Sequence, residues 1–315
     1  MLGFIVKRLL FLVPVLLAAT FFAFSLSLLS GTDPAVAAIR VNAMVPTPEL
    51  VAEVRHEFGL DKPFLVQYVS WLGSALSGDF GRSWSTGRPV AALAMEALPN
   101  TLVLALAALA VTLCVSVVLG AASAFTAGKA PDKWIRTLVF GLSSVPNYWI
   151  GLLLIWFFAV KLGWLPTSGM RSASAVILPA ATLSLEYIGT YVRLLRSEII
   201  AARSADWVLF AKSRGLGSAA VAGHLFINSL RGSATALGMS IPKLAAGAFI
   251  VECIFAWPGL GRLCVDAVFT RDIPVIQAYV VITSVLFVLF NLAADVFLVW
   301  LDPREAKLDQ TGSLS

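Results

Sequence analysis

Apolar residues fill long stretches of this chain, and polar residues gather between them. A helix that crosses a bilayer needs about 20 predominantly apolar residues. Six stretches meet this requirement: residues 9–30, 99–127, 137–160, 175–195, 235–257 and 275–301. The pattern therefore predicts an all-α integral membrane protein with six transmembrane helices.

Two polar segments between these stretches are long. Residues 31–98 follow the first predicted span, and they contain a predicted helix over 49–58, which Gly59 ends. Further along, Gln67 to Leu76 carry an apolar face at helical spacing, which is typical of packing against neighbouring spans.

The second long polar segment, 196–234, shows helical pattern on both sides of a glycine turn. These segments divide the chain into a first helix (1–30), a long loop with short helices (31–98), a five-helix core (99–301) and a polar tail (302–315).

The composition agrees with the membrane assignment. Hydrophobic residues make up 59% of the 315 residues and charged residues only 13%, against about 25% charged in soluble domains. This composition excludes an ordinary cytosolic enzyme. The net charge of +5 is too small and too dispersed to indicate a nucleic-acid partner, and the lipid bilayer is the expected surrounding.

The distribution of cations predicts the orientation. Short cytoplasmic loops are rich in Lys and Arg, and the short segment Gly128–Arg136 carries three cations in nine residues. This places the N-terminus in the cytoplasm and, with six spans, the C-terminus as well. A cleaved signal peptide is the alternative for the first span, but the apolar run from Leu9 to Ser30 is longer than a signal core of about 7–15 residues.

Little in the sequence indicates enzyme chemistry or a bound cofactor. Three cysteines without CxxC spacing and two histidines do not predict a metal site. No phosphate-binding Gly-x-x-x-x-Gly-Lys-Ser/Thr motif is present, and the glycines at 259–261 follow a span rather than a strand. We expect no cofactor on this chain and no catalytic residues.

Ionisable residues within predicted spans are costly and therefore informative. Glu186 lies near the middle of the fourth span, where a pore lining and an interhelical hydrogen bond are both open interpretations. For Glu252 and Asp295 the structural interpretation is favoured. Asn147, next to Pro146, could contact an exposed carbonyl or a solute. The candidate translocation path is Asn147, Glu186 and Asp295.

The most distinctive segment lies within 196–234. Asp206 can cap or charge the start of a short helix, Gly215 permits a sharp turn, and Ser218 can cap the next helix. Four residues of the first helix are predicted to share one face: Trp207, Phe210, Ala211 and Arg214. Such an amphipathic helix–turn–helix either lies on the membrane surface or presents a knob to a cytosolic partner.

With these motifs in view, the chain resembles the permease subunit of a binding-protein-dependent ABC importer of the dipeptide/oligopeptide/nickel class. The resemblance covers nearly the whole chain. The motifs that carry it are Gly59-Leu60-Asp61-Lys62-Pro63, Gly78-Asp79-Phe80-Gly81, Leu98-Pro99-Asn100-Thr101, Glu252-Cys253-Ile254-Phe255-Ala256-Trp257-Pro258-Gly259-Leu260-Gly261-Arg262, Arg271-Asp272-Ile273-Pro274-Val275-Ile276-Gln277 and Asp302-Pro303-Arg304.

In this class a Glu-Ala-Ala-x-x-x-Gly loop contacts the ATPase, and it maps here to Leu209-Phe210-Ala211 and Gly215. The last Ala and the Gly are present, whereas the Glu is absent. The resemblance implies an ATPase-coupling loop made of Asp206, Trp207, Phe210, Ala211, Arg214, Gly215, Leu216 and Gly217.

The resemblance also implies the partners and the location. These are a second homologous permease subunit, two cytosolic ATPase subunits that use the ATP, an extracytoplasmic solute-binding protein that meets 31–98 and 258–277, and the bacterial inner membrane.

Within the class, the match is closest to permeases for nickel or for metals bound to opine-type metallophores, through motifs such as Val145-Pro146-Asn147-Tyr148-Trp149. A bare ion would need His, Cys or carboxylate ligands that the spans hardly offer, so a chelate is the expected cargo. A dipeptide or oligopeptide permease is the alternative.

Two other classes fit less well. An ATP-independent secondary transporter predicts inverted repeats, which the sequence does not show. An intramembrane enzyme would need paired catalytic groups at one depth.

Overall fold

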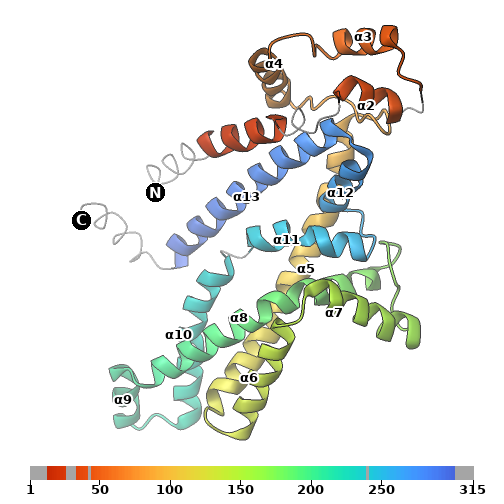
Figure 1. The fold of residues 1–315 in the computed structure, drawn as a ribbon. Helices are drawn as coiled ribbons and strands as arrows, with labels where there is room; N and C mark the ends of the chain where they lie inside the picture. The colour runs from red at the N-terminus through yellow and green to blue at the C-terminus, as the bar shows by residue number, and fades with distance from the viewer. Residues whose placement is uncertain (1–12, 26–32, 42–43, 239–240, 302–315) are drawn as a thin grey trace, which may run out of the picture. The chain divides into compact units, whose positions relative to one another are not determined.

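The computed structural model describes residues 13–25, 33–41, 44–238 and 241–301 (Figure 1). Within these ranges the chain is helical, and the β pairing consists of an isolated antiparallel bridge between Arg82 and Pro89. The prediction of an all-α protein is confirmed.

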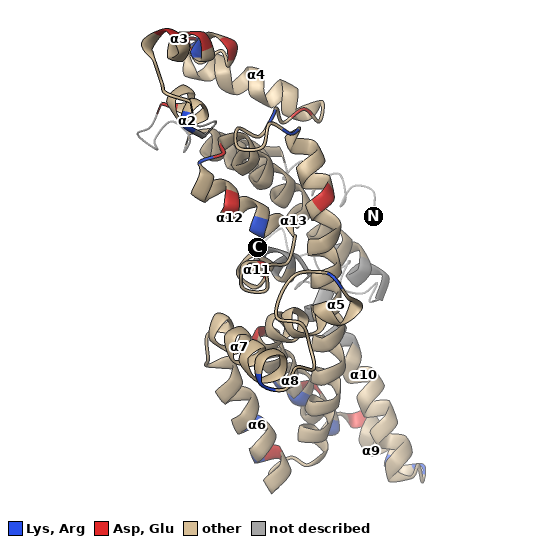
Figure 2. Cartoon of the chain, turned by 90° about the vertical axis from the view of Figure 1, so that its right-hand side faces the viewer, with Lys and Arg blue, Asp and Glu red and all other residues tan. Residues whose placement is uncertain are grey.

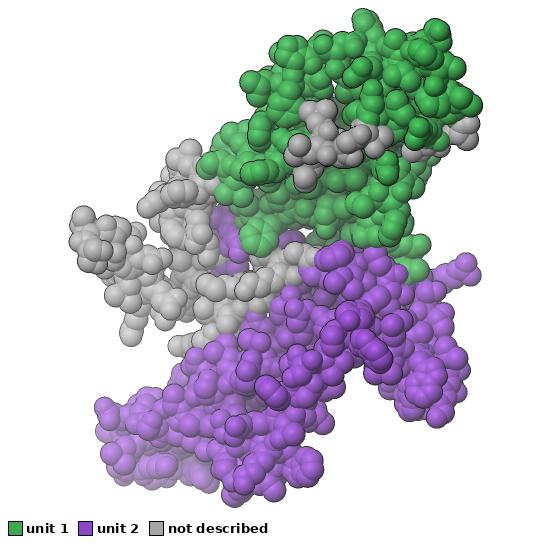
Figure 3. Space-filling view, in the orientation of Figure 1, with its two compact units in different colours: residues 1–102, 256–289 green, residues 103–255, 290–315 purple. Residues whose placement is uncertain are grey.

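The chain divides into two compact units, which Figure 3 distinguishes by colour. Unit 1 contains residues 1–102 and 256–289, and unit 2 contains residues 103–255 and 290–315. Two long helices contribute to both units: α5 (Val90–Phe125) and α13 (Ile273–Leu301).

Unit 1 holds the residues of the long polar segment. Besides its parts of α5 and α13, its helices are Val13–Ser25, α2 (Pro34–Val41), α3 (Pro48–Glu57), α4 (Phe64–Leu76) and α12 (Leu260–Thr270). The helix predicted over 49–58 is α3, which Thr47 caps, and Gly59 ends it with a φ of +63°. Charged residues crowd α3, whereas α4 has none (Figure 2).

The apolar stripe predicted from Gln67 to Leu76 is the packing face of α4. The ring of Tyr68 lies 5.4 Å from Phe21 and 5.7 Å from Phe24, both on the helix Val13–Ser25. The Tyr68 hydroxyl lies 2.9 Å from Thr20 Oγ1. The stripe therefore packs against the first apolar helix, as the sequence pattern indicated.

Unit 2 is built around α8 (Ile177–Arg203), which contacts α6, α7, α10 and α11. The other elements are α6 (Ala130–Ser143), α7 (Asn147–Leu154), the π-helix η1 (Ile155–Lys161), the 3₁₀ turn η2 (Ala173–Val176), α9 (Asp206–Ser213), α10 (Ser218–Gly238) and α11 (Ile241–Ile254). A close approach joins α6 and α8, where a Cβ on Gly189 would lie 2.1 Å from Ser143 Oγ.

Three helices in the described ranges are long and apolar enough to cross a membrane: Val90–Phe125, Ala173–Arg203 and Ile273–Ala294. They correspond to the spans predicted over 99–127, 175–195 and 275–301. The helix over the predicted span 175–195 is longer than that span, because α8 continues to Arg203 as one helix.

The span predicted over 137–160 is a bent pair rather than one continuous helix. Helix α6 ends at Ser143, α7 begins at Asn147, and the two are bent by 100°. Pro146 lacks an N–H and disfavours helical geometry at Val145, so the backbone ladder breaks there. The pair counts as a fourth span if both halves cross the membrane together.

Two predicted spans stay predictions. Of 9–30, the described part is the short apolar helix Val13–Ser25. Of 235–257, the described parts are the end of α10 and the 14-residue α11, with residues 239–240 outside the described ranges. Six spans and the cytoplasmic position of both termini are therefore untested, and the predicted tail 302–315 lies outside the described residues.

Candidate functional site

Helices α9 and α10 form the helix–turn–helix that the sequence predicted. Helix α9 leaves the end of α8, and α10 returns alongside α8 (Figure 1). Gly215 has a φ of +81°, and its amide donates to Lys212 O at 2.9 Å, which closes α9. The amide of Leu216 donates to Ala211 O at 3.2 Å.

The start of α9 refines the role of Asp206. Its N-cap is Ala205, whose methyl side chain cannot accept a hydrogen bond, and Asp206 is the first residue of the helix. Its carboxylate therefore favours the helix dipole without capping the helix. Helix α10 begins at Ser218, with Val221 N bonded to Gly217 O at 3.1 Å.

Helix α9 packs on α10 through a face centred on Val208. Val208 is buried, and with Trp207 and Ala211 it packs against Val221 and Leu225 of α10. Trp207 and Ala211 belong to the face predicted from the sequence, whereas Val208 was not named there. The spacing of Val221 and Leu225 is the sequence signal that could have revealed an apolar partner for Val208.

Phe210 and Arg214 lie outside this packed cluster and are exposed, so a shared face toward a partner stays a prediction for them. Phe210 is 61% exposed, and the guanidinium of Arg214 lies 5.7 Å from the centre of its ring. Leu209 is 73% exposed and Leu216 is 38% exposed. We call Leu209, Phe210 and Leu216 the apolar knob. Large apolar side chains exposed together are typical of an interaction site.

The structure brings together two of the three candidate path residues. Asn147, the first residue of α7, donates through Nδ2 to Oε2 of Glu186 on α8 at 2.6 Å. Glu186 is exposed, so the carboxylate is accessible at the break between α6 and α7. Asp295 lies in α13, but its side chain is outside the described residues. The backbone places Glu252 in α11, and it is fully buried.

A buried carboxylate that sequence reasoning missed joins α6 to α8. Asp132 accepts from Ser123 Oγ at 2.6 Å and from Gly128 N at 3.0 Å. Arg196 donates to both of its oxygens at 2.8 Å. The weak signal in the sequence is Pro131-Asp132 at the start of a helix, where proline and an acidic residue are both favoured.

In unit 1, Asp272 joins two segments that the sequence assigned to the same external face, within 31–98 and 258–277. Its buried carboxylate accepts from Ser83 Oγ at 2.5 Å, Ser85 Oγ at 2.8 Å, and the amides of Trp84 and Ser85 at 3.1 Å. We call Asp272 with residues 83–85 the Asp272 joint. The contact between Asp272 and residues 83–85 was not predicted from the sequence.

Two further motif segments meet elsewhere in unit 1. Trp257 Nε1 donates to Asn100 O at 2.9 Å, and Asn100 Nδ2 donates to Pro258 O at 2.7 Å. The amide of Leu260 donates to Thr101 Oγ1 at 2.8 Å. The Asn-Thr pair at the start of the apolar part of α5 therefore holds the Trp-Pro-Gly turn.

Within the described ranges, no three His, Cys, Asp or Glu side chains lie close enough together to hold a metal ion.

Comparison with known families identifies two matching regions. Residues 116–307 match the family described as binding-protein-dependent transport system inner membrane component. Residues 1–105 match the N-terminal region of the corresponding membrane components.

Several curated proteins are similar over almost the whole chain. The metal-staphylopine import system permease protein CntB of Staphylococcus aureus (strain NCTC 8325 / PS 47) is 38% identical over 96% of this chain and 98% of its own. A putative peptide transport system permease protein of Brucella abortus (strain 2308) is 36% identical over 96% and 99%. The oligopeptide transport system permease protein AppB of Bacillus subtilis (strain 168) is 35% identical over 96% and 99%.

One solved structure shares the fold. The crystal structure of an amino acid ABC transporter with histidines matches with a TM-score of 0.52 at 18% identity, over 65% of this chain and 92% of that one.

Proposed function

The chain belongs to the family of binding-protein-dependent transport system inner membrane components, and we propose that it forms the translocation path for a chelated transition metal, nickel or a related ion. It is therefore an ABC importer permease of the inner membrane, and its relatives are permease subunits rather than enzymes. The observation that carries the cargo proposal is the 38% identity with a metal-staphylopine permease across 96% of the chain.

The chemistry of the chain favours a chelate over a bare ion. A transition-metal ion that sheds its water needs several His, Cys or carboxylate ligands. The whole sequence has two histidines and three cysteines, and acidic residues are rare in its apolar stretches. A metal that travels inside an organic ligand needs contacts only to that ligand, which side chains such as Asn147 and Glu186 can supply. These two residues and Asp295 are the proposed path.

Uptake measurements test the cargo. Cells that carry the complete importer would be given labelled nickel alone, nickel with an opine-type chelator, or a labelled dipeptide. We expect uptake of nickel only with the chelator. Equal nickel uptake without any chelator would contradict the chelate.

A dipeptide or oligopeptide importer is the second candidate. Relatives named as peptide and oligopeptide permeases are nearly as similar, at 36% and 35% identity. The same uptake experiment separates the two candidates, because dipeptide uptake that excess nickel chelate does not reduce favours the second one.

We assign the coupling to the ATPase to α9 and the turn after it. The apolar knob projects from a helix that the buried Val208 ties to α10, so a push on the knob is transmitted to α10. Closure of a cytosolic ATPase around its ATP would then shift the membrane helices between inward and outward states. The hydrolysis belongs to the ATPase and not to this chain.

The proposed assembly contains this permease, a second homologous permease, two ATPase subunits and an extracytoplasmic solute-binding protein. The solute-binding protein would meet the face that the Asp272 joint holds together. Affinity purification of the tagged chain from its native membrane tests the assembly, because we expect an ATPase in equal amount to the permeases. An ATP-independent transporter predicts its absence.

A further inference from the structure

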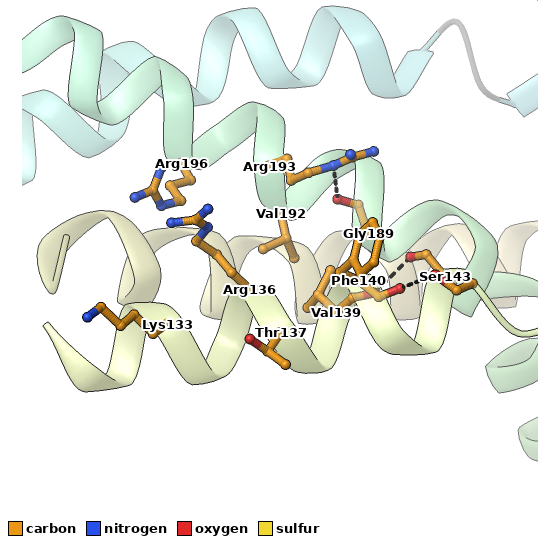
Figure 4. A pocket seen from close by; sticks show the side chains of 11 residues that line it. Lys133, Arg136, Thr137, Val139, Phe140, Ser143, Gly189, Val192, Arg193 and Arg196 are labelled. Carbon is orange, nitrogen blue, oxygen red and sulfur yellow. Dashed lines mark hydrogen bonds between the residues drawn. The ribbon is translucent and has the colours of Figure 1, made fainter. Parts of the chain in front are cut away.

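A cavity of about 780 Å³ lies between α6 and α8, and positively charged side chains dominate its wall. Lys133 and Arg136 come from α6, and Arg193 and Arg196 come from α8 (Figure 4). The hydroxyl groups of Thr137, Ser143 and Ser144 also line it. The cationic side chains donate hydrogen bonds, and the hydroxyl groups can donate as well as accept them, so this wall suits an anion.

Two of the four cations are held in place. Arg196 is fixed by two hydrogen bonds to Asp132, one donated from Nε and one from Nη2. Arg193 donates from Nε to Gly189 O at 3.2 Å. A guanidinium has five N–H groups, so each arginine keeps donors for a ligand after these bonds.

The other two cations, Lys133 and Arg136, are exposed and have no ion-pair partner within the part of the chain that the structure describes. Among the described residues, Asp132 is the acidic residue that forms an ion pair with one of these four cations, and Arg196 already neutralises it. The cavity therefore keeps a surplus of positive charge. Arginine side chains match the oxygen geometry of phosphate, and clustered cations favour it further.

Apolar side chains surround these cations on α6. Trp134 is 74% exposed and Leu138 is 57% exposed, while Phe140 is exposed and lines the cavity. Cations next to exposed tryptophan are typical of a helix at the membrane interface. Basic pockets between membrane helices bind anionic lipid headgroups, with the acyl chains on neighbouring apolar side chains.

We propose that the cavity between α6 and α8 is a binding site for a phosphate-bearing anion. The cations that line the cavity, Lys133, Arg136, Arg193 and Arg196, supply the positive charge that attracts the phosphate. Two sources can supply this group, the headgroup of an anionic phospholipid and free phosphate. The site is separate from the apolar knob and does not depend on the cargo.

The test measures binding to the full chain, purified in detergent, by native mass spectrometry. The probes are phosphatidylglycerol, phosphatidylcholine with matched acyl chains, and inorganic phosphate. The cavity variant is Lys133→Gln with Arg136→Gln, because both side chains are exposed and unpaired and should leave the fold intact. The control is Lys129→Gln with Arg203→Gln, which also removes one Lys and one Arg, at the start of α6 and the end of α8, where neither side chain lines the cavity.

Each cation contributes about fivefold to the binding of an anionic lipid, so the cavity variant should bind phosphatidylglycerol roughly 25-fold more weakly. The control should change binding less than threefold, and circular dichroism should show equal helix content in all three proteins. Preference for phosphatidylglycerol with no effect of phosphate identifies the lipid as the source. Saturable phosphate binding that the cavity variant loses identifies free phosphate. Equal binding by the cavity variant and the wild type, or an equal loss in the control, overturns the proposal.

Discussion

The helix–turn–helix of α9 and α10 and the Asp272 joint hold two segments together in different ways. At the turn, α9 rests on α10 through the apolar side chains of Val208, Val221 and Leu225. At the joint, one buried carboxylate accepts four hydrogen bonds from residues 83–85. Apolar contacts have no fixed direction and allow helices to shift, whereas a buried charge needs every donor in place.

This difference indicates what each region can do. A contact that transmits a push must move without breaking, and apolar packing tolerates small shifts of that kind. A surface that a partner recognises must keep its shape, and directional hydrogen bonds to a carboxylate supply rigidity. Substitutions should therefore harm the two regions by different routes, transport at the turn and local stability at the joint.

The largest effect is expected at Gly215. Gly215→Pro requires a φ near −65° where the turn has +81°, and it removes the amide that bonds to Lys212 O. We expect solute uptake to fall to background while the amount of chain in the membrane stays normal, as measured by uptake and by immunoblotting of membranes.

Gly223→Ala on α10 is the control, because open space surrounds Gly223 and its φ is not positive. This control should transport normally. Ala211→Asp should fail like Gly215→Pro, because it places a charged carboxylate against the apolar side chains of α10. Normal uptake by Gly215→Pro would contradict the coupling role.

The next largest effect is expected at the Asp272 joint. Asp272→Ala leaves two hydroxyls and two amides without their acceptor, which should cost about 3 kcal/mol of local stability. Protease cleavage within residues 83–85 should accelerate, and the thermal unfolding midpoint should fall.

Asp266→Ala is the control for this change, because Asp266 lies on the neighbouring α12 and pairs with Arg262 in an exposed ion pair. That pair contributes less than about 1 kcal/mol. If the two variants are equally resistant to protease, the joint does not stabilise this surface.

A smaller effect is expected from the apolar knob. Phe210→Ala removes an exposed ring, so the free chain should keep its stability. Burying a Phe side chain in a partner contributes about 1.5–3 kcal/mol, so retention of the ATPase on the tagged permease should weaken at least tenfold. Phe269→Ala on α12 removes a ring that is even more exposed, 84% against 61%, and should leave retention unchanged. Equal retention by both variants would remove Phe210 from the interface.

The smallest effect is expected from one donor of the joint. Ser85→Ala deletes the hydroxyl that donates to Asp272 at 2.8 Å but keeps the Ser85 amide bond. The carboxylate then retains three donors, so the loss should be about 1 kcal/mol in thermal unfolding. A loss as large as that of Asp272→Ala would mean that the joint depends on this one hydroxyl.

Much of the secondary structure could be predicted from local pattern. Helix α3 lies within a residue of its predicted bounds, and α9 and α10 flank the predicted turn at Gly215. The side of α9 that α10 covers could not be predicted in full, because a helix of eight residues has too few turns to show it. That side depends on the packing of α10, and Val208 lies at its centre.

The candidate path shows the same limit. The sequence predicted one span over 137–160 that contains Pro146, whereas the 100° angle between α6 and α7 depends on how each half packs against its neighbours. The hydrogen bond between Asn147 and Glu186 joins residues 39 positions apart, and each residue alone left its role open.

By itself, the sequence determined the class of the protein, the membrane environment, and the turns that need glycine, because composition and backbone preference act over a few residues. Only the tertiary structure decided which polar groups meet. Ser83 and Asp272 lie 189 positions apart, and Asp132 and Arg196 lie 64 apart. Such pairs form only when the helices between them pack, so no local sequence pattern predicts them.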